Sequence, residues 1–242
     1  RLARWKKEKW WKKQFIASQK LLPITRKHFP HLIEEVRGYA LGAKLNFEEL
    51  WTLCLEGDPD VEQCTSVVTN NGKLIAHNDD YPGTKNDACV LKKTIGDLTV
   101  LEIFYYGTLG GNAVSVNSHG FALLVNTLTS KNKQIGVPRN IIARWLSETK
   151  NPEDDFKKLK KMCRISGFNY NFVNTSGRLT NIETTAKEAV ITHPRIPFVH
   201  TNHYLSALKK YDLYKKPSSP CRYDFVKKNF RPQMNIAEIK KI

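Results

Sequence analysis

The hydrophobic pattern of this chain changes at residue 64, and that change restricts the fold more than any other feature. Residues 1–63 carry apolar side chains at the three- and four-residue spacing of helices. From Cys64 onward the apolar runs are short, rich in β-branched and aromatic residues, and separated by turn sequences. The pattern therefore predicts a helical segment over 1–63 and a separate strand-rich segment over 64–242, with the boundary at 63/64.

Within the first segment the pattern predicts three helices. The first is a basic helix over 1–22 that ends at Pro23, the second covers roughly 29–40, and the third is capped by Asn46. The basic helix has two interpretations: an arm that binds an anionic membrane surface or nucleic acid, or a helix that docks by its aromatic face with its lysines in water. We favour the docked helix.

The second segment opens with a hairpin pattern, in which Thr65–Thr69, the turn Asn70-Asn71-Gly72 and Lys73–His77 follow one another. The later part of the chain alternates between strands and helices. Strand patterns cover 88–93, 98–105, 113–116, 121–126, 170–174, 179–183 and 189–192, and helical patterns cover 138–149, 152–164 and 220–230. This order predicts an α+β layered domain.

The composition indicates a globular protein with a strongly basic surface. The chain has 242 residues, 40% of them hydrophobic, and a formal net charge of +16. Such a charge suits nucleic acid, anionic membranes or phosphorylated molecules, and the phosphates of an acyl-coenzyme A would also suit it. Because the lysines are scattered along the chain, plain solvation is favoured, and we expect neither a specific nucleic-acid partner nor a membrane span, since no apolar run reaches about 18 residues.

The five cysteines argue against a disulfide framework, because their number is odd and the chain is long. No C-x-x-C pair occurs, which argues against a structural zinc site. The compartment is left open, with the cytoplasm favoured. A homo-oligomer is also left open.

Cys64 begins the predicted hairpin, and its partner strand ends in His77-Asn78-Asp79-Asp80. Asp79 or Asp80 would then lie beyond the hairpin's far end, where it can fold back beside Cys64. From these residues alone, an edge-strand cysteine next to a turn rich in Asn and Asp is the favoured interpretation.

Four motifs in a fixed order give this cysteine a more specific meaning. Together they resemble the acyl-coenzyme A:isopenicillin N acyltransferase family of N-terminal-nucleophile hydrolases, as does the segment around Glu183. The motifs are Gln63-Cys64-Thr65-Ser66, His77-Asn78-Asp79-Asp80, Ser115-Val116-Asn117-Ser118-His119-Gly120 and His200-Thr201-Asn202-His203. The resemblance implies a four-layer αββα sandwich, a precursor that cuts itself before the cysteine, and amide hydrolysis or acyl transfer on a small-molecule amide or acyl-coenzyme A.

The resemblance also implies site residues. Cys64 would be the nucleophile, Asp80 the acid that orients its new amine, and Asn202 an oxyanion donor. Residues 1–63 would form the helical pro-segment or α-chain, and 64–242 the catalytic β-chain. No cofactor is implied.

Substrate contacts are assigned to Asn117, Tyr81 and Arg222. For Asn117 the alternative is a turn cap before Gly120, and for Arg222 a surface salt bridge. Asp79 is interpreted as a solvated turn residue. His77, His119, His200 and His203 match no standard zinc spacing, so they are expected to be pocket or structural groups, and no metal is predicted.

The chain departs from the family pattern at several points. Gln63 stands where many members have glycine, and neither the opening strands nor the late strands with an assisting Ser or Arg are found, so terminal strands are expected to be missing. Two other functions are therefore kept: a lipid-amide hydrolase of the ceramidase type, and a basic binding module without catalysis.

Overall fold

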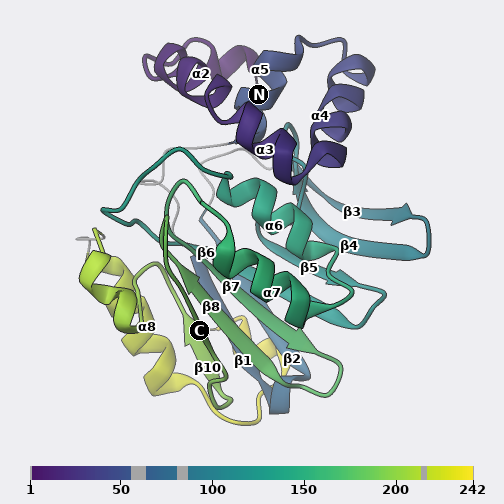
Figure 1. The fold of residues 1–242 in the computed structure, drawn as a ribbon. Helices are drawn as coiled ribbons and strands as arrows, with labels where there is room; N and C mark the ends of the chain where they lie inside the picture. Colours follow the sequence, from purple (N-terminus) through teal and green to yellow (C-terminus); the bar gives the residue numbers. More distant parts are fainter. Residues whose placement is uncertain (1, 56–63, 81–86, 214–216, 242) are drawn as a thin grey trace.

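The computed structural model describes residues 2–55, 64–80, 87–213 and 217–241. Within these described ranges, five helices precede the first strand, and the strands then form two antiparallel sheets (Figure 1). The helices are α1 (Leu2–Trp5), α2 (Trp11–Gln19), α3 (Leu22–His28), α4 (Pro30–Gly42), α5 (Phe47–Cys54), α6 (Arg139–Ser147), α7 (Pro152–Lys161), α8 (Ser218–Asn229) and α9 (Ile236–Ile239). The strands are β1 (Cys64–Thr69), β2 (Leu74–Asp79), β3 (Ala88–Ile95), β4 (Leu98–Tyr105), β5 (Val114–Asn117), β6 (Phe121–Thr127), β7 (Phe168–Asn174), β8 (Leu179–Thr184), β9 (Ala189–Thr192) and β10 (Phe198–His200).

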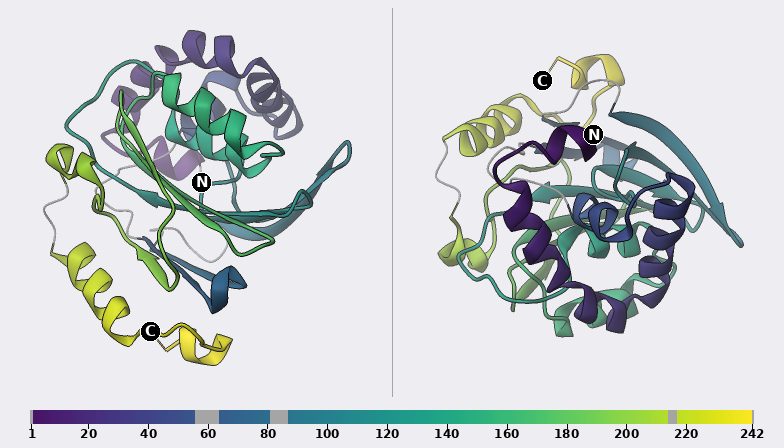
Figure 2. Two further views of the ribbon diagram at one scale, coloured as in Figure 1. Left: turned by 60° about the horizontal axis from the view of Figure 1, so that its bottom comes forward. Right: turned by 90° about the horizontal axis from the view of Figure 1, so that it is seen from above.

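The two sheets pack face to face and are covered by helices on both sides. The larger sheet has the order β3-β4-β5-β6-β7-β8-β9 and the smaller one the order β10-β1-β2. Val68 of β1 meets Leu124 and Val173 of the larger sheet in one buried cluster. Helices α6 and α7 cover the other face of the larger sheet, and α8 lies outside the smaller sheet (Figure 2). The predicted αββα layering is confirmed.

The helical segment α1–α5 lies over α6, where it extends the core beyond the layers (Figure 1). Phe29, Ile33 and Trp51 from this segment share one buried cluster with Ile141 and Leu146 of α6. Burying side chains of this size stabilises the fold by roughly 1.5–3 kcal/mol each. The helical segment therefore packs as an integral part of the fold.

The single basic helix predicted over 1–22 is wrong. The helix breaks after Trp5, and Pro23 lies in the first turn of α3 instead of ending a helix. Proline is tolerated there because the first N–H groups of a helix have no intrahelical partner. The predicted cap is confirmed, since the Asn46 side chain accepts a hydrogen bond from the Glu49 N–H.

Helix α2 docks on α5 by its aromatic face. Trp11 is buried, the Ser18 and Thr52 hydroxyls lie 2.7 Å apart, and the Trp51 indole N–H donates to the Ser18 carbonyl. Docking of this helix onto the fold is confirmed, with Trp11 on its buried side. Among the described residues, no helix combines the length and apolar composition that crossing a bilayer requires.

Candidate active site at Cys64

Strand register brings the first functional side chains together. In the β1–β2 hairpin Cys64 pairs with Asp79, and Ser66 pairs with His77. Because side chains alternate along a strand and paired residues share a face, these four point to the same side of the hairpin. The Cys64 Sγ lies 3.6 Å from Asp79 Oδ1. The other Asp79 oxygen accepts a short hydrogen bond from the Tyr105 hydroxyl of β4, so the carboxylate is held facing the sulfur.

The contact expected of Asp80 is made by Asp79. Asp80 is exposed, and its carboxylate accepts a 2.6 Å hydrogen bond from the Asn78 side chain. The assignment of Asp79 as a solvated turn residue is wrong, because β2 continues to Asp79 and holds it opposite Cys64. One further step along the chain points the next side chain away from that face.

Asn202 holds the backbone nitrogen of Cys64. Its Oδ1 accepts from the Cys64 N–H at 2.8 Å, and its Nδ2 donates to the Thr127 carbonyl at 3.1 Å. The orientation of the amide is fixed by these partners, since an N–H can only donate and a carbonyl can only accept. Asn202 is fully buried. The predicted oxyanion role is separate from this contact and stays a prediction.

Arg222 of α8 holds the same residue from its carbonyl side. One guanidinium nitrogen donates to the Cys64 carbonyl and to the Thr65 hydroxyl, both at 2.7 Å, and the other donates to Asn202 Oδ1 at 2.8 Å. These contacts take the place of the surface salt bridge considered for Arg222. Both peptide groups of Cys64 are thus bound by side chains distant in sequence.

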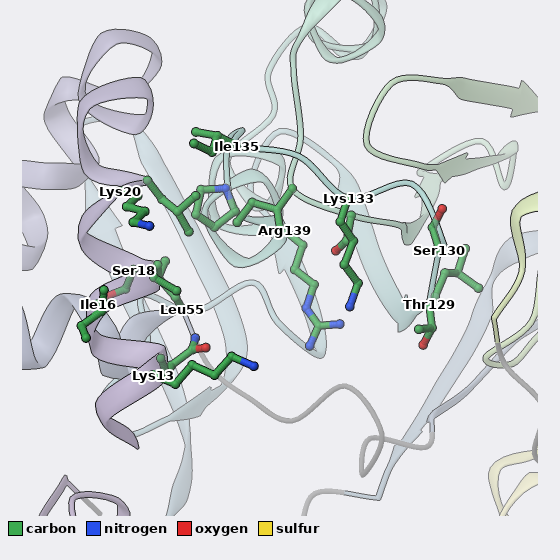
Figure 3. Close-up of a pocket in the computed structure, with 17 residues that line it drawn as sticks. Lys13, Ile16, Ser18, Lys20, Leu55, Thr129, Ser130, Lys133, Ile135 and Arg139 are labelled. Atoms are coloured by element: carbon green, nitrogen blue, oxygen red, sulfur yellow. The ribbon is translucent and has the colours of Figure 1, made fainter. Parts of the chain in front are cut away.

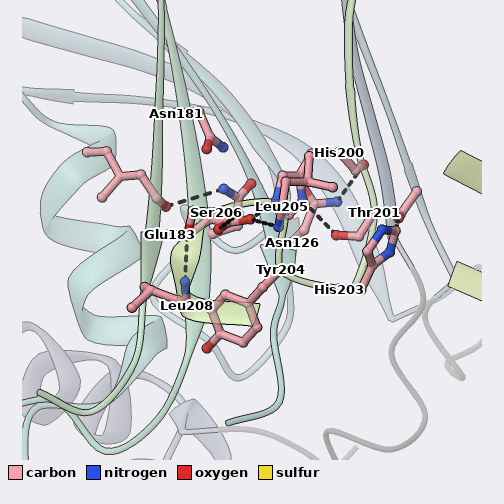
Figure 4. Close-up of polar contacts among 12 residues, drawn as sticks. Asn126, Asn181, Glu183, His200, Thr201, His203, Tyr204, Leu205, Ser206 and Leu208 are labelled. Atoms are coloured by element: carbon pink, nitrogen blue, oxygen red, sulfur yellow. Dashed lines mark hydrogen bonds and ion pairs between the residues drawn. The ribbon is translucent and has the colours of Figure 1, made fainter. Parts of the chain in front are cut away.

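A buried ion pair supports the loop that carries Asn202 (Figure 4). Glu183 accepts from His200 Nε2 at 2.8 Å and from the N–H groups of Leu205 and Ser206 at 2.7 and 2.8 Å. The other His200 nitrogen faces the Thr201 carbonyl at 2.7 Å. Burial alone would raise the pKa of Glu183, but the hydrogen bond and charge of His200 and the Leu205 N–H outweigh it and lower the pKa.

The position of Asn117 does not fit a substrate contact. Its oxygen accepts from the N–H groups of His119 and Phe121, and its nitrogen donates to the carbonyls of Ser147 and Thr149. These four bonds use the full hydrogen-bonding capacity of an amide. The turn-cap alternative is confirmed. Tyr81 lies outside the described residues.

His77 completes a group with metal-binding donors. Donor atoms of Cys64, His77 and Asp79 all lie within 4.8 Å of one another. Burial lowers the pKa of His77 to about 4, which leaves the ring neutral and able to bind a metal at neutral pH. Thiolate, imidazole and carboxylate are the ligands that zinc prefers, so these residues fit such an ion. Sequence spacing does not reveal this group, because hairpin register assembles it.

Comparison with known proteins identifies the class. A layered αββα fold with a cysteine at the head of a strand hairpin is the architecture expected of the N-terminal-nucleophile hydrolases. The sequence model of the family described as acyl-coenzyme A:6-aminopenicillanic acid acyl-transferase matches residues 67–241. The chain belongs to this family of amide hydrolases and acyltransferases, which confirms the resemblance inferred from the motifs.

The individual proteins that the chain resembles share less than a third of its sequence. The β-alanyl-dopamine/carcinine hydrolase of Drosophila melanogaster is 28% identical over 166 residues, and the match covers 57% of this chain and 43% of that protein. The chain therefore spans less than half the length of this relative. Among solved structures, a conjugated bile acid hydrolase mutant from Clostridium perfringens is 15% identical, with a TM-score of 0.45 over 74% of this chain and 77% of that one. Penicillin V acylase from Agrobacterium tumefaciens is 13% identical, with a TM-score of 0.36 over 68% and 62%.

Proposed function

We propose that this chain hydrolyses or transfers the acyl group of a small N-acyl amide, with Cys64 as the nucleophile after self-cleavage of the Gln63–Cys64 bond. Residues 1–63 would then be the helical α-chain and 64–242 the catalytic β-chain. The proposal is supported by two contacts of Cys64: its backbone nitrogen donates to the Asn202 side chain, and its sulfur faces the Asp79 carboxylate. Side chains are thus directed at the two atoms that such a mechanism uses.

Liberation of the Cys64 nitrogen gives the thiol a base. A thiol of pKa about 8.5 is mostly protonated at neutral pH, whereas an α-amine of pKa about 7.7–8.0 can accept its proton. The sulfur would attack the acyl carbonyl and form a thioester, and the protonated amine would give its proton to the leaving nitrogen. Water or an acceptor amine, deprotonated by the same amine, would then take the acyl group from the sulfur.

The surrounding residues have distinct tasks in this scheme. Asn202 Oδ1 would keep the amine beside the sulfur, and Asp79 would orient the proton transfer. Arg222 would hold the Cys64 carbonyl still. The Asn202 amide has two N–H bonds and one donates to Thr127, so the second would be the oxyanion donor, a role worth about 3–4 kcal/mol of barrier in comparable sites.

Trapping the acyl-enzyme tests the proposal. The protein is incubated with N-acyl p-nitroanilides of different chain lengths, quenched in acid, digested and analysed by mass spectrometry. We expect an acyl adduct on the peptide that contains Cys64, released by hydroxylamine as a thioester must be. Cys163→Ser, which removes an exposed thiol, is the matched control and should keep the adduct. The assignment of Cys64 as nucleophile would be refuted if these amides are hydrolysed but no acyl adduct is found on Cys64 with any of them. An adduct on another cysteine would refute it as well.

The neighbouring aspartates give a matched pair of variants. We expect Asp79→Asn to lower kcat by about 100-fold. Without the Asp79 carboxylate, the group that transfers the proton would no longer be held in position, and a misplacement of this kind lowers the rate by about that factor. Asp80→Asn should stay within about threefold of the wild type, since an exposed carboxylate one residue away does not face the sulfur. Amine release from an N-acyl amide measures both. The reverse order of effects would restore the original assignment of Asp80.

A further inference from the structure

A cavity of about 530 Å³ opens between the helical segment and the layered domain (Figure 3). Helix α2 and the end of α5 form one side, and the stretch from Leu128 into the start of α6 forms the other. A cavity of this size accepts a small organic ligand. The segments that meet here are far apart in sequence.

The cavity collects positive charge. Lys13 and Lys20 come from the α2 side, and Lys133 and Arg139 from the opposite side (Figure 3). None of the described residues that line it is acidic. Helix α6 also begins here, and its N-cap residue Pro138 offers no side-chain cap, so the partial positive charge of the helix N-terminus adds to that of the side chains. An anion would therefore be attracted from three elements at once.

Most of the remaining wall is apolar. Ile16, Leu21, Leu55, Leu128 and Ile135 contribute hydrocarbon surface on both sides. A cavity that combines cations with such walls fits an amphipathic anion better than a bare inorganic ion, because burial of an apolar stem adds about 25 cal/mol per Å² to the attraction of charge. A hydrophobic amine would meet the same apolar surface but would be repelled by the lysines.

Hydrogen bonds connect one wall of the cavity to the backbone of the candidate nucleophile. Leu128 lines it, and the preceding residue, Thr127, accepts a hydrogen bond from Asn202, which in turn accepts from the Cys64 N–H. Two hydrogen bonds thus connect the residue beside the cavity wall to the backbone of Cys64. A substrate whose scissile amide lies at the sulfur could extend its remaining part into the cavity.

We propose that this cavity binds the part of the substrate that carries an anionic group on an apolar stem, and that the protein selects negatively charged N-acyl amides over positively charged ones. This inference rests on the proposed function for its link to catalysis, but binding itself does not require turnover. Carboxylate and phosphate share the chemistry that the cavity recognises, and an acyl-coenzyme A would present its phosphates to the same cations.

Binding is measured by calorimetry on Cys64→Ala, so that a failure of catalysis cannot affect the result. The probes are decanoate, decyl phosphate, decanol and decylamine, which share one stem. We expect the two anions to bind at least tenfold more tightly than decanol, and decylamine to bind most weakly. The order of the two anions distinguishes a carboxylate site from a phosphate site. Equal affinities across the four probes would overturn the proposal.

Variants locate the site. Adding Lys133→Glu to the Cys64→Ala background should weaken decanoate binding at least tenfold, and Lys133→Gln by less, because the first reverses a charge that the second only removes. Lys187→Glu makes the same charge reversal at an exposed position that does not line the cavity and should leave binding within twofold. Circular dichroism confirms that each variant is folded. Decanoate affinity that responds equally to Lys133→Glu and Lys187→Glu would show attraction by net charge alone and would refute the site.

Discussion

Cys64→Ala is expected to lower the turnover of an N-acyl amide by at least about 10⁴-fold while the protein stays folded. The loss is large because the sulfur forms the covalent bond of the proposed mechanism, and alanine offers no replacement. The fold should persist, since the hydrogen bonds that Asn202 and Arg222 make to residue 64 involve its backbone. Steady-state amine release measures the effect, with circular dichroism as the test of folding.

Two further variants make this result specific. Cys163→Ala removes an exposed thiol remote from the hairpin and should retain turnover within about twofold. Cys64→Ser keeps a weaker nucleophile in the same place and should retain more activity than alanine. Turnover in Cys64→Ala equal to that of the wild type would assign the chemistry to another residue.

Glu183→Gln is expected to lower the free energy of unfolding by about 3–5 kcal/mol, because it leaves the buried His200 ring without its charged partner. The variant keeps one amide oxygen, which cannot accept all three hydrogen bonds from His200, Leu205 and Ser206 as well as a carboxylate does. Urea unfolding measures the change. Glu188→Gln is the control. Glu188 is exposed and lies four residues after Thr184, the last residue of β8, so its substitution should change stability by less than about 0.5 kcal/mol.

The same pair gives a pH dependence with a defined sign. The pKa of Glu183 is lowered in the folded protein, so its contribution to stability is present above the unfolded carboxyl value of about 4.3. That contribution is lost as pH falls through the lower folded value. The wild type should therefore lose its advantage over Glu183→Gln below about pH 4. A constant difference in urea midpoint between pH 7 and the acid limit of folding would contradict the ion pair.

Local sequence predicted the elements whose signals are local. The hairpin turn at Asn70-Asn71-Gly72, the Asn46 cap, and strands β4 and β9 are all where the pattern placed them, because turn chemistry, capping and alternation each involve only a few neighbouring residues. Strand β10 was missed, since three residues are too few to show an alternating pattern. Strand β10 nonetheless pairs with β1 and ends at His200, so this pairing places Asn202, two residues further on, beside Cys64.

The candidate site was predictable only in part. The motifs indicated Cys64 and Asn202, but the choice between Asp79 and Asp80 depends on strand register, which a one-residue shift reverses. The backbone contacts of Arg222 depend on how α8 packs against the smaller sheet. Two features of the sequence indicated Glu183. Its segment shares the family resemblance, and it is an acidic residue within an otherwise uncharged strand pattern, where an unpaired charge would be costly to bury.

Intact mass spectrometry of the purified wild type beside Cys64→Ala tests the central claim most directly. If the Cys64 nitrogen is liberated by the chain's own chemistry, the wild type should give two fragments that separate between Gln63 and Cys64, and Cys64→Ala should give one uncut chain. An uncut wild type that turns over N-acyl amides at its full rate would contradict the account.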